Sequence, residues 1–161
     1  MKRDFASLNP QEALWVAVRI EERNAQIYEN FALMFQGYDP ETVEIFKEMA
    51  TEEWQHMDQL DARHRERYGE QELTLGPADI RQPVEAPIVT AGELFIYDGL
   101  SIREALEVGL RAEREARDFY RELAGRTADA ALRSLYQELA DAENEHEVRL
   151  RNKIRAYAEK A

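Results

Sequence analysis

Two short segments of the chain pair a carboxylate with an imidazole at a spacing that suits metal binding. Glu53 precedes His56 by three residues, and Glu143 precedes His146 by the same interval. Residues i and i+3 lie on one face of an α-helix, so both side chains of a pair can reach one metal ion. A single Glu-x-x-His is common in a chain with 33 acidic residues, but these two copies use two of its three histidines. The alternative is that both pairs are exposed and bind nothing.

Two isolated glutamates fall where a helix core normally has apolar residues. Glu21 lies seven residues before Tyr28, and Glu113 lies seven residues before Tyr120, each on the apolar stripe of an expected helix. An unpaired charge on a buried stripe is costly. We therefore predict that these two carboxylates face a cation, as the paired ones do.

Four amphipathic segments would position these side chains. Asn9-Pro10 and the capping box Ser101–Glu104 indicate helix starts, while Gly37 and Gly69 indicate helix ends. The expected helices cover about residues 9–36, 40–68, 101–124 and 128–158. Residues 70–100 hold three prolines and three glycines and are predicted to be a long connection. A short helical or interfacial patch is expected within it at Leu94–Tyr97.

The chain also contains an internal repeat. Residues 17–32 align with 109–124 at an offset of 92, and residues 49–60 align with 139–150 at an offset of 90. The repeat unit is a helical hairpin, so the predicted fold is an all-α four-helix bundle whose hairpins are related by a pseudo-twofold axis. Residues 1–161 are expected to form one domain, with hairpins at about 9–69 and 101–158. The crossover at 70–100 would make the second and third helices parallel.

Packing the two hairpins together brings four carboxylates and two imidazoles to one level of the bundle. Buried carboxylates repel one another, and two divalent ions would supply four compensating charges. Bundles with one Glu from each of two helices and Glu-x-x-His from the other two build di-iron or di-manganese sites. Mixed carboxylate and imidazole ligation suits iron or manganese, with zinc able to compete. The predicted ligands are Glu21, Glu53, His56, Glu113, Glu143 and His146, with Glu53 and Glu143 as bridges.

The composition excludes several other kinds of site and partner. Cysteine is absent, which excludes disulfides, cysteine-bound zinc, thiolate nucleophiles and iron–sulfur clusters. The net charge of −12 disfavours nucleic acid and anionic lipid as partners. With no long apolar run and no signal-peptide core, the sequence is expected to belong to a cytoplasmic protein.

The ligand candidates, with a tyrosine seven residues after each isolated glutamate, resemble the rubrerythrin branch of the ferritin-like superfamily. The resemblance covers nearly the whole chain and implies a ferritin-like four-helix bundle. It also implies an oxo- or hydroxo-bridged di-iron centre that reacts with oxygen or hydrogen peroxide. Tyr28 and Tyr120 would then hydrogen-bond the ligand carboxylates, the alternative being that they are ordinary core aromatics. Arg67–Glu70 and Asp79–Arg81 look like the erythrin domain fused to membrane iron transporters in some bacteria.

Two departures from the rubrerythrin pattern bear on function. Without cysteine this sequence holds no rubredoxin-like electron donor, and Ala116 stands where rubrerythrins carry an additional glutamate one turn after Glu113. The expected activity is oxidation of Fe(II), reduction of hydrogen peroxide, or both. The protein would act as a ferroxidase or peroxidase with two iron ions and an external electron donor. The alternative is a non-catalytic module that binds, delivers or senses iron for a partner transporter or compartment.

Three residues outside this set have less specific interpretations. His64 lies too far along its helix from Glu53 to join the same centre, and it is predicted to be a surface histidine. Trp15 and Trp54 lie beside the inward stripe, so they either face a partner subunit or pack on the flank of the bundle. Together with the apolar patch at Leu94–Tyr97, they favour a homodimer.

Overall fold

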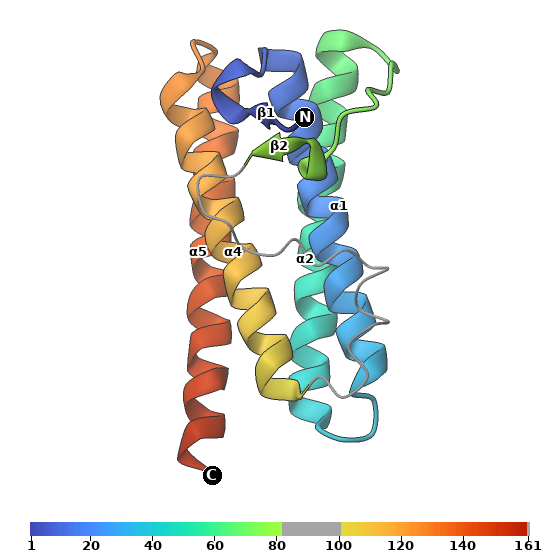
Figure 1. The fold of residues 1–161 in the computed structure, drawn as a ribbon, viewed down its shortest axis with the longest axis vertical. Helices are drawn as coiled ribbons and strands as arrows, with labels where there is room; N and C mark the ends of the chain where they lie inside the picture. Colours follow the sequence, from blue (N-terminus) through green and yellow to red (C-terminus); the bar gives the residue numbers. More distant parts are fainter. Residues whose placement is uncertain (82–100, 161) are drawn as a thin grey trace.

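The computed structural model describes residues 1–81 and 101–160. The described residues form four long helices, α1 (Pro10–Met34), α2 (Pro40–Tyr68), α4 (Ile102–Arg126) and α5 (Ala130–Glu159) (Figure 1). Each begins after a polar residue whose side chain accepts a hydrogen bond from the backbone N–H three residues later. These capping residues are Asn9, Asp39, Ser101 and Asp129. The helix bounds therefore lie within two residues of those predicted from the sequence.

The helices pair as two hairpins, which confirms the predicted four-helix bundle. α1 packs along α2, and α4 packs along α5. In Figure 1, α4 begins at the end of the bundle where α1 turns into α2, and it runs parallel to α2. Gly37, in the α1–α2 turn, has a φ of +88°, a left-handed conformation that favours glycine. The end of α2 and the start of α4 therefore lie at opposite ends of the bundle, as the predicted crossover requires.

The core consists of two apolar clusters, and every predicted metal ligand lies between them in sequence. On α1 the first cluster ends at Ile20 and the second begins at Ile27, with Glu21 between. The same order holds on the other three helices, where each candidate ligand separates a stretch of one cluster from a stretch of the other. The polar centre is therefore a layer within the bundle, enclosed by apolar side chains at both ends.

A small strand pair that was not predicted from the sequence lies beside the helices near one end of the bundle (Figure 1). β1 (Arg3–Asp4) pairs in parallel with β2 (Ile80–Arg81), flanked by the short 3-10 helices η1 (Phe5–Ser7) and η2 (Pro77–Asp79). The pairing buries Ile80 in the apolar cluster that also holds Phe5. The predicted patch at Leu94–Tyr97 lies outside the described residues.

The prediction of a surface histidine at position 64 is wrong. His64 is only 1% exposed, and its ring centroid lies 5.1 Å from that of Trp15 and 5.4 Å from that of Tyr68. Residues 13–18 of α1 are all buried, because neighbouring elements cover that turn of the helix on every side. Trp15 and His64 are therefore buried, although they lie beside the main apolar stripes of their helices.

The two tryptophans pack within the chain. Trp15 is 7% exposed, while the half-buried Trp54 donates a hydrogen bond from Nε1 to Glu29 at 2.7 Å. Trp15 therefore supplies no exposed apolar surface and Trp54 only part of its side chain, and the homodimer stays a prediction. Within residues 1–81 and 101–160, none of the helices is long and apolar enough to cross a membrane.

Candidate metal centre

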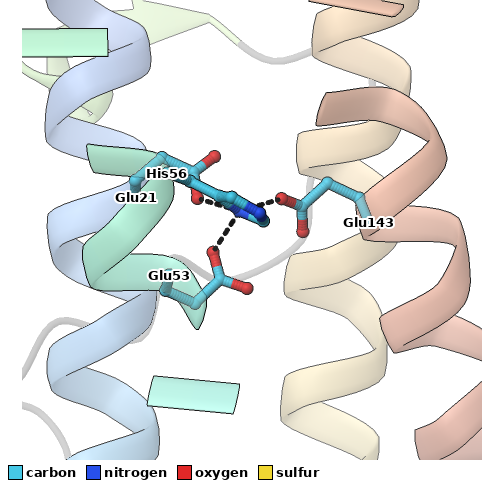
Figure 2. Close-up of side chains that lie close together, drawn as sticks. All are labelled: Glu21, Glu53, His56 and Glu143. Atoms are coloured by element: carbon cyan, nitrogen blue, oxygen red, sulfur yellow. Dashed lines mark ion pairs between the residues drawn. The ribbon is translucent and has the colours of Figure 1, made fainter. Parts of the chain in front are cut away.

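Side chains from opposite hairpins converge at the middle of the bundle. Figure 2 shows Glu21 of α1, Glu53 and His56 of α2, and Glu143 of α5 pointing toward one another. The His56 Nδ1 lies 3.4 Å from a Glu21 oxygen, 3.5 Å from a Glu143 oxygen and 3.9 Å from a Glu53 oxygen. These four residues can offer ligand atoms that all lie within 4.8 Å of one another.

A second group of the same kind surrounds the other imidazole. The His146 Nδ1 lies 2.8 Å from a Glu53 oxygen, 3.3 Å from Glu113 and 3.7 Å from Glu143. The two rings lie face to face, with centroids 5.9 Å apart. Glu53 and Glu143 belong to both groups. All six predicted ligand residues are thus brought together, and each of the two residues predicted as bridges lies near both imidazoles.

In the described part of the chain, several oxygens of the buried carboxylates lack the hydrogen bonds that buried charges need. Glu21, Glu53, Glu113 and Glu143 have no exposed surface. Among the described residues, no donor hydrogen-bonds to either Glu143 oxygen or to Oε2 of Glu21. Isolated buried carboxylates are strongly disfavoured unless cations or protons compensate them. Oxygen-rich donors with one imidazole per group fit a pair of divalent iron or manganese ions.

Burial and mutual repulsion shift the ionisation of the centre when no metal is bound. Burial and the adjacent Glu21 charge raise the pKa of Glu53 to about 7. Burial, with Glu143 and Glu53 nearby, likewise raises the pKa of Glu113. Burial alone would lower the pKa of His56, but the surrounding carboxylates raise it to about 12. Without bound metal, the centre therefore holds protons where metal ions would place their charge.

Two buried tyrosines orient the isolated glutamates across the hairpin interface. The Tyr28 hydroxyl of α1 donates to Oε1 of Glu113 on α4, and the Tyr120 hydroxyl of α4 donates to Oε1 of Glu21 on α1. Each bond leaves the second carboxylate oxygen facing an imidazole. Burial and the neighbouring glutamates raise the pKa of both tyrosines, which keeps them protonated as donors. The hydrogen bonds implied by the resemblance are present.

Gly109 gives Tyr28 the room to reach across. A Cβ at position 109 would lie 3.1 Å from Cε1 and 3.2 Å from the hydroxyl oxygen of Tyr28. The same hydroxyl lies 3.4 Å from the Gly109 carbonyl oxygen. Glycine is therefore favoured here by the close approach of a side chain, not by an unusual backbone angle.

Glu52 was missed by the sequence analysis, although it contacts a predicted ligand directly. Its Oε2 lies 2.5 Å from Nε2 of His146, and its Oε1 accepts a bond from Arg149 at 3.3 Å. The hydrogen bond with His146 lowers the pKa of Glu52 to about 2. No sequence signal could have identified it, because its side chain is 38% exposed and its helix is rich in glutamate.

Two other buried polar side chains near the centre were also not predicted. Asn24, one turn after Glu21, is fully buried, and neither of its amide atoms hydrogen-bonds to a described residue. It is the repeat equivalent of Ala116. Glu147 is buried too, but it ion-pairs with three arginines, Arg114, Arg117 and Arg151. That carboxylate is already compensated, which separates it from the six clustered residues.

The family assignment follows from comparison over most of the chain. A model of the Rubrerythrin family matches residues 12–154. The chain belongs to the rubrerythrin family. No match was found among curated proteins. This member of the rubrerythrin family carries a buried carboxylate and histidine cluster of the dinuclear type.

Solved structures share the ferritin-like fold of this rubrerythrin-family chain. An uncharacterized conserved protein from Magnetospirillum magnetotacticum has 24% identity and a TM-score of 0.72, covering 92% of this chain and 95% of its own. A hypothetical protein from Pyrococcus furiosus has 21% identity and a TM-score of 0.73, covering 94% and 91%. A Rhodobacter capsulatus bacterioferritin, described with a metal-free dinuclear site and haem iron, has 24% identity and a TM-score of 0.71, covering 100% and 91%.

Proposed function

We propose that this protein binds two iron ions and acts as an oxidoreductase on Fe(II), hydrogen peroxide or both. The observation that carries the proposal is the pair of ligand groups sharing Glu53 and Glu143. Each group offers one imidazole and one unshared glutamate, Glu21 with His56 and Glu113 with His146. Two bridging carboxylates, two terminal carboxylates and two imidazoles balance the charge of two divalent ions.

The protein's contribution is to fix the donors and exclude bulk water. Bound iron would supply electron exchange with oxygen or peroxide, cycling between Fe(II) and Fe(III). The tyrosine hydrogen bonds hold Glu21 and Glu113 in one orientation, so that little rearrangement is needed when a metal ion arrives. Apolar clusters above and below the polar layer keep solvent away from the carboxylates.

The glutamates and tyrosines of the centre also hold and release protons. Binding of a cation must displace the proton that Glu53, with its pKa raised to about 7, retains near neutral pH, and the raised pKa of Glu113 acts in the same direction. Tyr28 and Tyr120 keep their protons and can donate hydrogen bonds to the glutamates in either charge state. Proton release on loading is therefore part of the proposed binding reaction.

The proposed reactions differ in the source of their electrons. The chain holds no cysteine and hence no rubredoxin-like donor of its own. Fe(II) as substrate would supply electrons itself, whereas sustained peroxide reduction without Fe(II) would need an external donor. In ferroxidase chemistry the oxidant is reduced at the expense of Fe(II), so that reaction needs no separate donor.

Anaerobic addition of Fe(II), followed by oxygen or peroxide, tests the proposal. In wild type, the Fe(III) absorbance should keep increasing as many Fe(II) ions per chain are added. In Glu53→Ala this increase should be absent. Glu48→Ala, which removes an exposed carboxylate from the same helix, is the matched control and should behave as wild type. Oxidation that ends after two Fe(II) per chain would favour an iron-binding or delivery module. Equal oxidation in Glu53→Ala would overturn the assignment of the site.

A further inference from the structure

The two imidazoles of the centre are held differently by the surrounding protein. We infer that the two metal positions are unequal, with the His146 position binding first and more tightly and the His56 position exchanging readily. Glu52 is the positioning residue that creates the difference. The inference depends on the proposed two-metal centre but concerns occupancy, not turnover.

The contact between Glu52 and His146 selects the nitrogen that faces the metal. An imidazole whose Nε2–H donates to a carboxylate presents the lone pair of Nδ1 on its other side. In this chain the Nε2 of His146 lies 2.5 Å from Glu52, while its Nδ1 faces Glu53, Glu113 and Glu143. The bond from Arg149 to the other oxygen of Glu52 fixes that carboxylate in turn. His146 is thereby oriented for a cation before one arrives.

The internal repeat shows that the other half of the bundle lacks this arrangement. At the offset of 90 residues that relates His56 to His146, the equivalent of Glu52 is Ala142 and the equivalent of Arg149 is Gln59. Within residues 1–81 and 101–160, no side chain hydrogen-bonds to Nε2 of His56. Among the described residues, His56 therefore lacks the carboxylate contact at Nε2 that fixes the tautomer of His146.

The different exposure of the two imidazoles also makes the two metal positions unequal. The side chain of His56 is 14% exposed, whereas that of His146 is 1% exposed. Water can therefore compete with His56 for a metal ion and help it to leave. Carboxylates that orient a ligand histidine typically contribute 10–100-fold to metal affinity. The His146 position is expected to bind more tightly by about that factor.

Titration of the metal-free protein with Co(II), followed by its visible absorption, measures the two positions without any turnover. Wild type should fill in two resolved steps. His146→Ala should remove the tight step and His56→Ala the weak one, which assigns them. Glu52→Ala should weaken the tight step about 10–100-fold and leave the weak step unchanged. Glu48→Ala, one turn earlier on the same helix, should change neither.

Two further variants separate positioning from general damage. Glu52→Gln keeps an oxygen that can accept from Nε2–H, so it should lose less affinity than Glu52→Ala. Ala142→Glu places a carboxylate at the repeat-equivalent position and should tighten the weak step. The inference is overturned if wild type shows one class of site, if Glu52→Ala leaves both steps unchanged, or if Glu52→Gln is as damaging as Glu52→Ala.

These outcomes are distinguishable from failure of the proposed function. Two equal Co(II) sites in a protein that still oxidises Fe(II) would refute the inequality alone. Two unequal sites in a protein that oxidises no Fe(II) would support the inequality and refute the oxidoreductase proposal.

Discussion

The metal-free protein should lose stability as the pH rises from 4.5 to 7, the opposite of what most carboxylates cause. The pKa of Glu53 is raised from 4.5 to about 7 in the folded state. Between those values the folded protein keeps a proton that the unfolded chain has released, so stability falls as pH increases. The raised pKa of Glu113 acts in the same direction. The raised pKa of His56 acts at higher pH. The stability that it contributes is fully present below pH 6.5 and is lost as the pH rises toward 12.

The size of the effect follows from the pKa of Glu53. Raising one carboxyl pKa from 4.5 to about 7 corresponds to roughly 3 kcal/mol of stability lost across that range. For a chain of 161 residues this is a fall in melting temperature of roughly 6–12 °C. Bound metal reverses the trend, because the ligands must be deprotonated and affinity rises with pH.

Urea unfolding followed by circular dichroism, in chelator and at intervals from pH 4.5 to 7.5, measures the effect. Glu53→Gln removes the titrating group and should reduce the slope, while Glu48→Gln should leave it unchanged. The same series with two equivalents of Mn(II) should show stability rising over the same range. Metal-free stability that stays constant or rises between pH 4.5 and 7 would refute the electrostatic reasoning.

Three further changes test how the centre is built. Gly109→Ala should destabilise the protein by about 1–3 kcal/mol in urea unfolding, since its Cβ would lie 3.1 Å from the Tyr28 ring; an unchanged midpoint would contradict the packing argument. Tyr28→Phe should leave Glu113 without its donor and weaken binding of one of two Co(II) ions in titration calorimetry; identical isotherms would contradict the orienting role. Ala116→Glu should add a fifth carboxylate one turn from Glu113, lowering the metal-free melting temperature and raising it in the metal-loaded protein; equal shifts in both states would place the new side chain outside the centre.

The clustering of the six candidate residues could be predicted, because each of them stands out from its surroundings in the sequence. Glu21 and Glu113 interrupt apolar stripes, and two histidines recur at matching positions of a repeat. Capping residues such as Asn9 and Ser101 determine the helix bounds locally, so these too were predictable. The hairpins followed from the internal repeat, and the parallel course of α2 and α4 followed from the long segment between Gly69 and residue 101.

What could not be predicted depends on contacts between elements that are distant in sequence. Glu52 differs from other glutamates of α2 only because α5 presents His146 to it. His64 was predicted wrongly because its burial depends on Trp15, 49 residues earlier, and on neighbours that cover the flank of α1. The β1–β2 pair joins two-residue strands that carry no periodic signal of their own.

Metal content is the most direct test of the central proposal. Wild type, Glu53→Ala and Glu48→Ala should be stripped with chelator, loaded anaerobically with excess Fe(II), desalted and analysed for iron per chain. The proposal predicts two ions in wild type and in Glu48→Ala, and one or none in Glu53→Ala, because Glu53 belongs to both ligand groups. Equal iron content in all three proteins would contradict it.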